Sequence, residues 1–167
     1  MQTDKQINNT YSELSNSELK VSMILPEHLN IFWPKVKNLL KKSVKFTYGR
    51  YTLLDIYDVI LSGEYQLWVI YNMNENKFND PIAAIATTIT KYPQKKCVCI
   101  HFIGGTQLSK WKDKFLSKLR NFARDMKCDG IEATGRPGWI KHIVNQNKAK
   151  VRFVTFDLPL HEERVNG

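Results

Sequence analysis

The residues best placed for chemistry stand where a predicted strand meets a predicted helix. Gly104 and Gly105 end the run KCVCIHFIGG, and TQLSK opens a long helical pattern. The first amides of a helix have no partner within it and lie at the positive end of its dipole, so such a turn can bind an anion. Thr106, Gln107 and Lys110 would supply amides and positive charge. The alternative is that the glycines only relieve crowding at the end of the strand.

Cys97, Cys99 and His101 alternate along the same predicted strand and are therefore expected on one face of the sheet. Residues four apart in a strand are separated by about 13 Å, because each residue adds about 3.3 Å. Metal–ligand bonds span only about 2.0–2.3 Å, so one ion cannot bind all three side chains. The sequence predicts no metal site here.

The remaining elements follow from hydrophobic periodicity and turn residues. Residues 1–22 are polar and predict a flexible arm, 23–160 predict one domain, and 161–167 a short tail. Helices are expected at 25–44, with a kink or restart at Pro34, and from Thr52 to Gly63, where Thr52 and Asp55 resemble a capping box. Three antiparallel strands should follow at 66–71, 81–92 and 96–103. After the central helix at about 109–127 come a strand at 130–134, a short helix at 139–146 and a strand at 151–158.

The central helix has the clearest pattern in the sequence. Its apolar stripe repeats every three or four residues and comprises Leu108, Trp111, Phe115, Leu119, Phe122 and Met126. The other face holds seven bases, namely Lys110, Lys112, Lys114, Lys118, Arg120, Arg124 and Lys127, against two acids. Nucleic-acid binding by this helix is possible but is less favoured than a protein partner, because its aromatic rings fall on the stripe expected to be buried and cannot stack on bases.

Composition points to a basic globular protein. The 167 residues are 43% hydrophobic and 11% aromatic, and the formal net charge is +9, which attracts polyanions. Three cysteines do not make a disulfide framework, which favours a reducing cytoplasm. No apolar run reaches the roughly 20 residues that span a bilayer, so no membrane span is expected.

The order of elements resembles the GNAT acetyltransferase superfamily, an α/β fold in which an antiparallel meander is followed by a strand–helix–strand crossover. Several motifs resemble GNAT-like proteins of tailed bacteriophages more specifically. They are Trp33-Pro34, Leu67-Trp68-Val69, the threonine-rich strand ending in Tyr92-Pro93, Gly104-Gly105, Trp111, and Gly135-Arg136-Pro137-Gly138-Trp139. The resemblance covers roughly residues 25–160.

The resemblance implies acetyl-CoA as cofactor, held by a loop of the form Gln/Arg-x-x-Gly-x-Gly/Ala at the start of the central helix. Here the glycines precede that position, and none occurs between Thr106 and Asp129. The family often uses a tyrosine on the short helix as general acid, and this chain has no tyrosine after Tyr92. Glu132 and His142 are the candidate base and acid that remain. The favoured alternatives are that Glu132 is a charge at the strand edge or a partner for Arg136, and that His142 is a surface residue.

Arg136 and Trp139 form the most distinctive polar–aromatic pair. The resemblance places Arg136 where GNAT enzymes often contact CoA, and a guanidinium there could bind phosphate. The structural alternative is that Arg136 pairs with a carboxylate such as Glu132 while Trp139 packs on the sheet.

Two functions are therefore expected from the sequence. The first is a phage GNAT-like protein with a degenerate acetyl-CoA site, acting as a virion-associated or accessory binding protein whose partners are other virion proteins. It would be found in the host cytoplasm or incorporated into the particle. The second is an active acetyl-CoA-dependent N-acetyltransferase.

Overall fold

The computed structural model describes residues 18–74, 77–135 and 149–151. The chain divides into two compact units, Met1–Thr134 and Gly135–Gly167. The fold reported below is that of the first unit. The expected domain at 23–160 stays a prediction, because most of the second unit lies outside the described residues.

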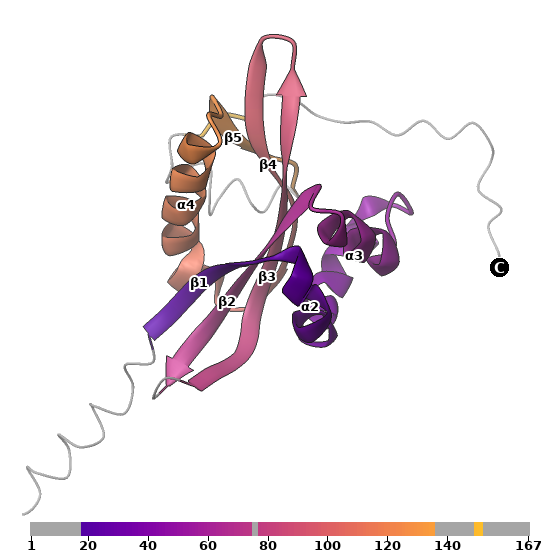
Figure 1. Ribbon diagram of the computed structural model, residues 1–167, viewed down its shortest axis with the longest axis vertical. Coiled ribbons are helices and arrows are strands. Elements are labelled where there is room, and N and C mark those ends of the chain that lie inside the picture. Colours follow the sequence, from indigo (N-terminus) through magenta and orange to yellow (C-terminus); the bar gives the residue numbers. More distant parts are fainter. Residues whose placement is uncertain (1–17, 75–76, 136–148, 152–167) are drawn as a thin grey trace, which may run out of the picture. The chain divides into compact units, whose positions relative to one another are not determined.

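The described residues form a five-stranded sheet with its strands in sequence order (Figure 1). The strands are β1 (Glu18–Ile24), β2 (Tyr65–Asn74), β3 (Lys77–Tyr92), β4 (Lys95–Gly105) and β5 (Gly130–Ala133). The first four pair antiparallel, and β5 joins β4 in parallel. The predicted mixed α/β fold, with a meander followed by a parallel crossover, is confirmed.

The starts of two strands differ most from the prediction. β1 begins at Glu18, inside the segment 1–22 that was expected to be a flexible arm, while residues 1–17 lie outside the description. Its alternation of Leu19, Val21 and Met23 with polar residues is a strand pattern, and it pairs with β2. β3 starts at Lys77 rather than at Pro81, and its pairing with β2 is irregular next to Pro81, which has no amide hydrogen to donate.

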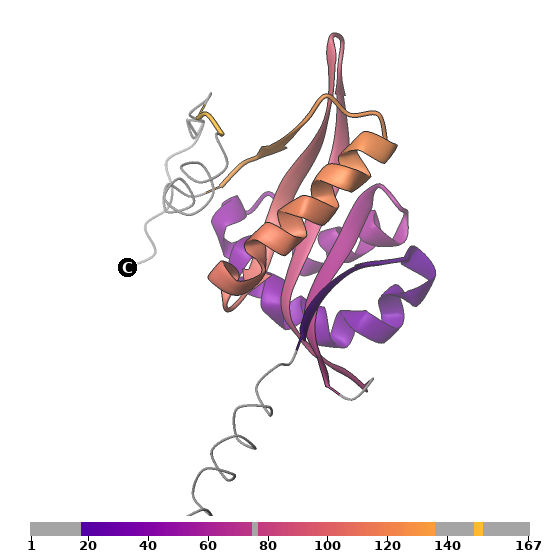
Figure 2. The ribbon, with the colours of Figure 1, turned by 90° about the vertical axis from the view of Figure 1, so that its left-hand side faces the viewer.

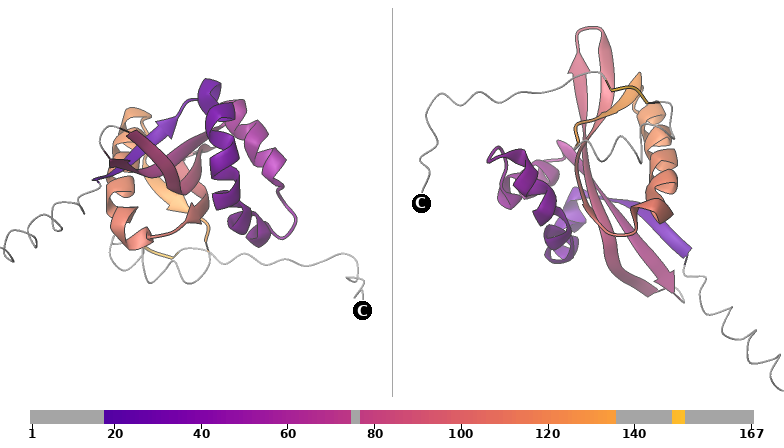
Figure 3. Two further views of the ribbon diagram at one scale, coloured as in Figure 1. Left: turned by 90° about the horizontal axis from the view of Figure 1, so that it is seen from below. Right: turned by 180° about the vertical axis from the view of Figure 1, so that it is seen from behind.

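Helices cover both faces of the sheet. The 3-10 turn η1 (Pro26–His28) leads into α2 (Leu29–Val44), which is followed by η2 (Lys45–Thr47) and α3 (Leu53–Leu61). Figures 1 and 3 show α2 and α3 on one face and α4 (Leu108–Asp125) on the other. α2 continues through Pro34 as one helix, so the expected restart does not occur.

Each helical layer buries its own hydrophobic cluster. Leu29, Val36 and Leu40 of α2 join Ile56 and Ile60 of α3 against the sheet, and each of these side chains is fully buried. On the opposite face α4 lies across the strands, as Figure 2 shows, and packs its aromatic residues against Trp68 of β2. The hydrophobic effect thus stabilises a three-layer unit.

The predicted apolar stripe of α4 is largely confirmed. Trp111, Phe115 and Leu119 are buried, Phe122 is half-buried, and Met126 is exposed where the helix has ended. Lys112 was expected on the basic outer face but is buried. A lysine stem can lie along apolar surface while its ammonium group remains near polar atoms, here within 3.9 Å of the Asp113 carboxylate.

The last two predicted elements, the helix at 139–146 and the strand at 151–158, lie outside the described residues except for Val151. Among the helices that the structure does describe, none is long and apolar enough to cross a membrane.

The capping box of α3 is confirmed and gives a direct test of the local structure. Thr52 Oγ1 accepts a hydrogen bond from the Asp55 amide at 3.2 Å, and the Thr52 amide donates to the Asp55 carboxylate at 2.6 Å. We predict that Thr52→Ala lowers the free energy of unfolding by about 1 kcal/mol, measured by urea denaturation, because it leaves a helix amide without a partner. Thr52→Ser keeps the oxygen and should restore most of the stability; equal losses in the two variants would contradict a capping role.

Candidate functional site

The pairing of β4 changes along its length. Ala86 pairs with Phe102 and Thr87 with Ile100, so His101 is an extra residue in β4, a β-bulge. β5 pairs with β4 only from Cys97 to Ile100 and ends at Ala133, whereas β4 continues to Gly105. Beyond Ile100, the β5-side edge of β4 therefore has no strand partner among the described residues. Backbone groups at such an edge are available to a ligand.

A polar cluster lies beside this point, on the face of the sheet that also carries α2 and α3. The Tyr92 hydroxyl donates to Glu132 Oε1 at 2.5 Å. The Cys99 thiol lies 2.8 Å from the same oxygen and 3.1 Å from the Thr90 hydroxyl. Strand register explains the grouping, because Cys99 is level with Glu132 of β5 and the β3–β4 hairpin brings Tyr92 alongside. We call Thr90, Tyr92, Cys99 and Glu132 the Glu132 cluster.

Electrostatics keeps the Glu132 carboxylate ionised. Burial acts to raise the pKa of Glu132, but hydrogen bonds from Cys99 and Tyr92 outweigh it, and the net effect lowers the pKa below 4.5. The hydrogen bond to Glu132 raises the pKa of Tyr92 to about 12. Burial, followed by the Glu132 hydrogen bond, raises the pKa of Cys99 to about 12. At neutral pH the cluster therefore holds one carboxylate among protonated donors.

These protonation states limit the chemistry. The Cys99 thiol is not a nucleophile, because thiolates are the reactive species. The carboxylate is a weak base, but it can attract a cationic amine at the sheet surface. Burial also raises the pKa of the neighbouring Cys97 thiol, with the charge of Glu132 adding to the effect.

His101 lies in a separate contact on the bulge. Its Nδ1 is 3.0 Å from the Tyr65 hydroxyl, and the two rings meet edge to face with centroids 5.3 Å apart. Loss of surrounding water lowers the pKa of His101, although part of the residue is exposed. No group of three or more potential metal ligands gathers within the part of the chain that the structure describes.

Sequence reasoning selected Glu132 but missed its partners. The family resemblance implies a tyrosine on the short helix after the fifth strand, whereas Tyr92 comes from β3, 40 residues before Glu132 in the chain. The available signal was the two-residue spacing of Thr88, Thr90 and Tyr92, which places all three on one face of a strand. The spacing alone does not show which residue of β5 lies near Tyr92, because β4 separates the two strands in the sheet. Arg136, Trp139 and His142 lie outside the described residues.

Gly104 and Gly105 have clear packing roles. A Cβ atom on Gly104 would overlap the Leu39 carbonyl oxygen of α2, and one on Gly105 would overlap the backbone of Ile82 and Ala83. Gly105 also has φ +130°, which side chains rarely allow. Crowding therefore accounts for both glycines, and their part in cofactor binding stays a prediction.

The connection from β4 to α4 is only Thr106 and Gln107. The Thr106 amide donates to Ile82 O at 3.0 Å, and its carbonyl accepts from Trp111 Nε1 at 2.7 Å. The Lys110 amide donates to Gln107 O at 2.9 Å, within the first helical turn. Of the amides proposed for anion binding, two are thus already satisfied within the protein.

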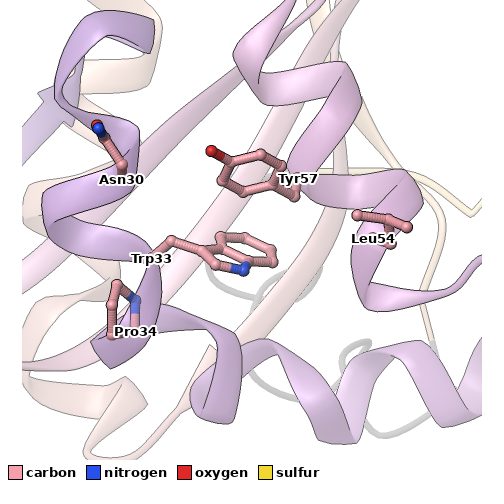
Figure 4. Close-up of a pocket in the computed structure, with 5 residues that line it drawn as sticks. All are labelled: Asn30, Trp33, Pro34, Leu54 and Tyr57. Carbon is pink, nitrogen blue, oxygen red and sulfur yellow. The ribbon is translucent and has the colours of Figure 1, made fainter.

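A pocket of about 290 Å³ lies between α2 and α3 (Figure 4). It is lined by Asn30, Trp33, Pro34, Leu54 and Tyr57, and the Trp33 and Tyr57 rings meet edge to face at 5.2 Å. Pro34 has no amide hydrogen, so it cannot donate the usual helical hydrogen bond to the Asn30 carbonyl. No residue of the Glu132 cluster lines this pocket.

Comparison with solved structures identifies the fold. The chain resembles a protein described as a probable acetyltransferase, with a TM-score of 0.61 and 12% identity over 86% of this chain and 99% of the other. It also resembles an aminoglycoside acetyltransferase from an uncultured soil sample, in complex with sisomicin (TM-score 0.59, 11% identity, 86% and 97% covered). A third is a ribosomal-protein-alanine N-acetyltransferase from Brucella melitensis biovar Abortus 2308 (TM-score 0.59, 9% identity, 86% and 100% covered).

The chain thus has the GNAT acetyltransferase fold at low sequence identity. No family model and no curated protein matches it. Fold alone does not establish an activity.

The packing role of Gly104 can be tested by adding one methyl group. We predict that Gly104→Ala lowers the free energy of unfolding by about 3 kcal/mol, the upper part of the usual range for overpacking, because the obstacle is backbone. Gly130→Ala is the matched control, since its Cβ would meet only the Lys95 side chain at an ordinary 3.9 Å. Denaturant unfolding that gave both variants the same stability would contradict the close approach of α2 to β4.

The Glu132–Tyr92 hydrogen bond predicts a change in titration. Tyr92→Phe should raise the pKa of Glu132 toward 4.5, as followed by NMR of the side-chain carboxyl carbon. The folded-state pKa lies below the unfolded one, so the contribution of Glu132 to stability is present above about pH 4.5 and is lost as the pH falls through the folded pKa. The variant should therefore lose less stability on acidification. Tyr48→Phe, outside the cluster, should leave the Glu132 titration unchanged; an identical shift there would refute the assignment.

Proposed function

We propose that this protein uses the GNAT fold as an accessory binding protein, a bacteriophage component that associates with the virion, and that its acetyl-CoA site is degenerate. The proposal is supported chiefly by the β4–α4 connection. A loop that wraps a pyrophosphate needs glycines and unpaired amides at the helix start. Here the connection has two residues, and the amides of Thr106 and Lys110 have acceptors within the protein.

Further support for a phage accessory role comes from the sequence. The joint order of the Trp33-Pro34, Gly104-Gly105 and Gly135–Trp139 motifs resembles phage GNAT-like proteins. The net charge of +9 suits association with acidic partners inside or around a particle.

A second function, acetyl-CoA-dependent N-acetyl transfer to an amine, is favoured by the Glu132 cluster. Glu132 lies next to the point where β5 ends and the edge of β4 continues without a strand partner among the described residues. When bound, acetyl-CoA would supply the activated acetyl group. Glu132 would attract the amine as a cation, and the amine would have to lose a proton before its lone pair attacks the acetyl carbon. The Tyr92 hydroxyl would remain protonated and would keep its hydrogen bond to Glu132, which holds that carboxylate in place.

Ligand-dependent melting separates the two functions. A ligand at a hundred times its dissociation constant raises the free energy of unfolding by about 2.7 kcal/mol. We predict that acetyl-CoA at about 1 mM leaves the melting temperature unchanged, because the two-residue connection contains no glycine and the amides of Thr106 and Lys110 already have acceptors within the protein. A clear upward shift, together with acetylation of a polyamine or aminoglycoside that is lost in Glu132→Gln, would favour the enzyme instead. Absence of the protein from purified phage particles by mass spectrometry would refute the virion role.

A further inference from the structure

The segment from α2 to the start of α3 contains many bases and no acid. Between Glu27 and Asp55 there is no acidic residue. The same stretch contains six exposed bases, which are Lys35, Lys37, Lys41, Lys42, Lys45 and Arg50. Lys35 forms an ion pair with Asp80. An anionic ligand would relieve the repulsion among these like charges.

Aromatic side chains stand among these bases and face the solvent. Tyr48 is 78% exposed and Phe46 is 45% exposed. Lys45 precedes them and Arg50 follows, so the two rings are flanked by bases within six residues. We call Lys41, Lys42, Lys45, Phe46, Tyr48 and Arg50 the basic–aromatic surface.

The turn that presents Tyr48 is well defined. Tyr48 has φ +53° and Gly49 has φ +78°, both in the left-handed region. Thr47 holds the turn together, because its hydroxyl donates to Val44 O at 2.8 Å and its carbonyl accepts from the Arg50 amide at 3.2 Å. A tyrosine is an uncommon choice at such a backbone conformation, where Asn or Gly costs less. The exposed ring also gains little from burial, so packing does not explain it.

α4 provides the contrast within the same protein. It has exposed bases such as Lys118 and Arg124, but Trp111 and Phe115 are buried against the sheet. A basic face without rings offers charge only. The basic–aromatic surface offers charge and an exposed ring together, which is the combination that binds single-stranded nucleic acid.

We propose that the basic–aromatic surface binds single-stranded nucleic acid. Lys41, Lys42 and Lys45 lie within about one helical turn and contact successive phosphates, while an unpaired base stacks on Tyr48. Binding does not depend on sequence, because every base has a flat face. A duplex is disfavoured because its bases are already stacked on each other. An acidic peptide would use the charges but has no need of the ring.

The ring is tested with a fluorescein-labelled oligo-dT of about 12 nucleotides, within the usual range for single-strand sites. Anisotropy titrations of the full chain should show saturable binding. Tyr48→Asn should weaken binding about tenfold, because one stacking contact is lost. Asn suits the left-handed backbone, so the turn and the melting temperature should be retained. Tyr48→Phe keeps the ring and should bind as the original protein does. Unchanged affinity in Tyr48→Asn would overturn the stacking contact.

The charges are tested with two variants of equal net charge. Lys41→Gln with Lys42→Gln should reduce the slope of log K against log salt by about 1.4, since each single-strand phosphate contact contributes about 0.7. Lys118→Gln with Arg124→Gln on α4 should leave the slope nearly unchanged. Equal effects of the two pairs would show attraction by net charge alone and would overturn the site.

The class of partner is tested by competition. Unlabelled single-stranded oligonucleotide should displace the probe, whereas a duplex of the same length and polyglutamate should be at least tenfold less effective. If polyglutamate displaced the probe as well as the single strand does, at the same concentration of negative charges, the surface would be assigned to an acidic protein instead. Preference for the duplex would equally overturn the proposal. The outcome is independent of acetyl-CoA, because the surface shares no residue with the Glu132 cluster.

Discussion

The antiparallel pairing of β3 with β4, interrupted once at His101, is the constraint on which the rest of this structure depends. Backbone hydrogen bonds must be satisfied along both strands, so one extra residue in β4 changes the register beyond it. Before the bulge, Cys97 to Ile100 accept β5 as a parallel neighbour. After it, β4 continues toward α4 without β5. The bulge thus coincides with the point where the edge of β4 loses its strand partner among the described residues.

The close contact of α2 with β4 depends on the same strand. Gly104 sits under the Leu39 carbonyl, and no other residue type fits there. Burial of Val36 and Leu40 against the sheet holds α2 at this distance. The close approach of α2 therefore fixes the residue type at this short segment.

The polar groups of the sheet form a connected arrangement rather than a set of independent residues. One Glu132 oxygen meets both the Tyr92 hydroxyl and the Cys99 thiol, so the three titrations influence one another. An ionised carboxylate stabilised in this way is better suited to attracting a cation than to removing a proton. The basic–aromatic surface carries the opposite charge, so the unit presents two electrostatically distinct regions on different elements.

The sequence by itself determined the order of elements from α2 to β5, the α4 stripe and the Thr52–Asp55 capping box, and it pointed to Glu132 as a candidate site residue. These depend on local periodicity and on contacts between near neighbours, which residue spacing encodes directly. β1 also has the alternation of apolar and polar residues that indicates a strand. The polar composition of residues 1–22 nevertheless led to the prediction of a flexible arm. Only the tertiary structure decided that Tyr92 reaches Glu132, that His101 is the bulged residue, that Lys112 is buried and that Tyr48 faces solvent. Strand register and helix docking set these positions, because both depend on hydrogen bonds and packing between residues far apart in the chain.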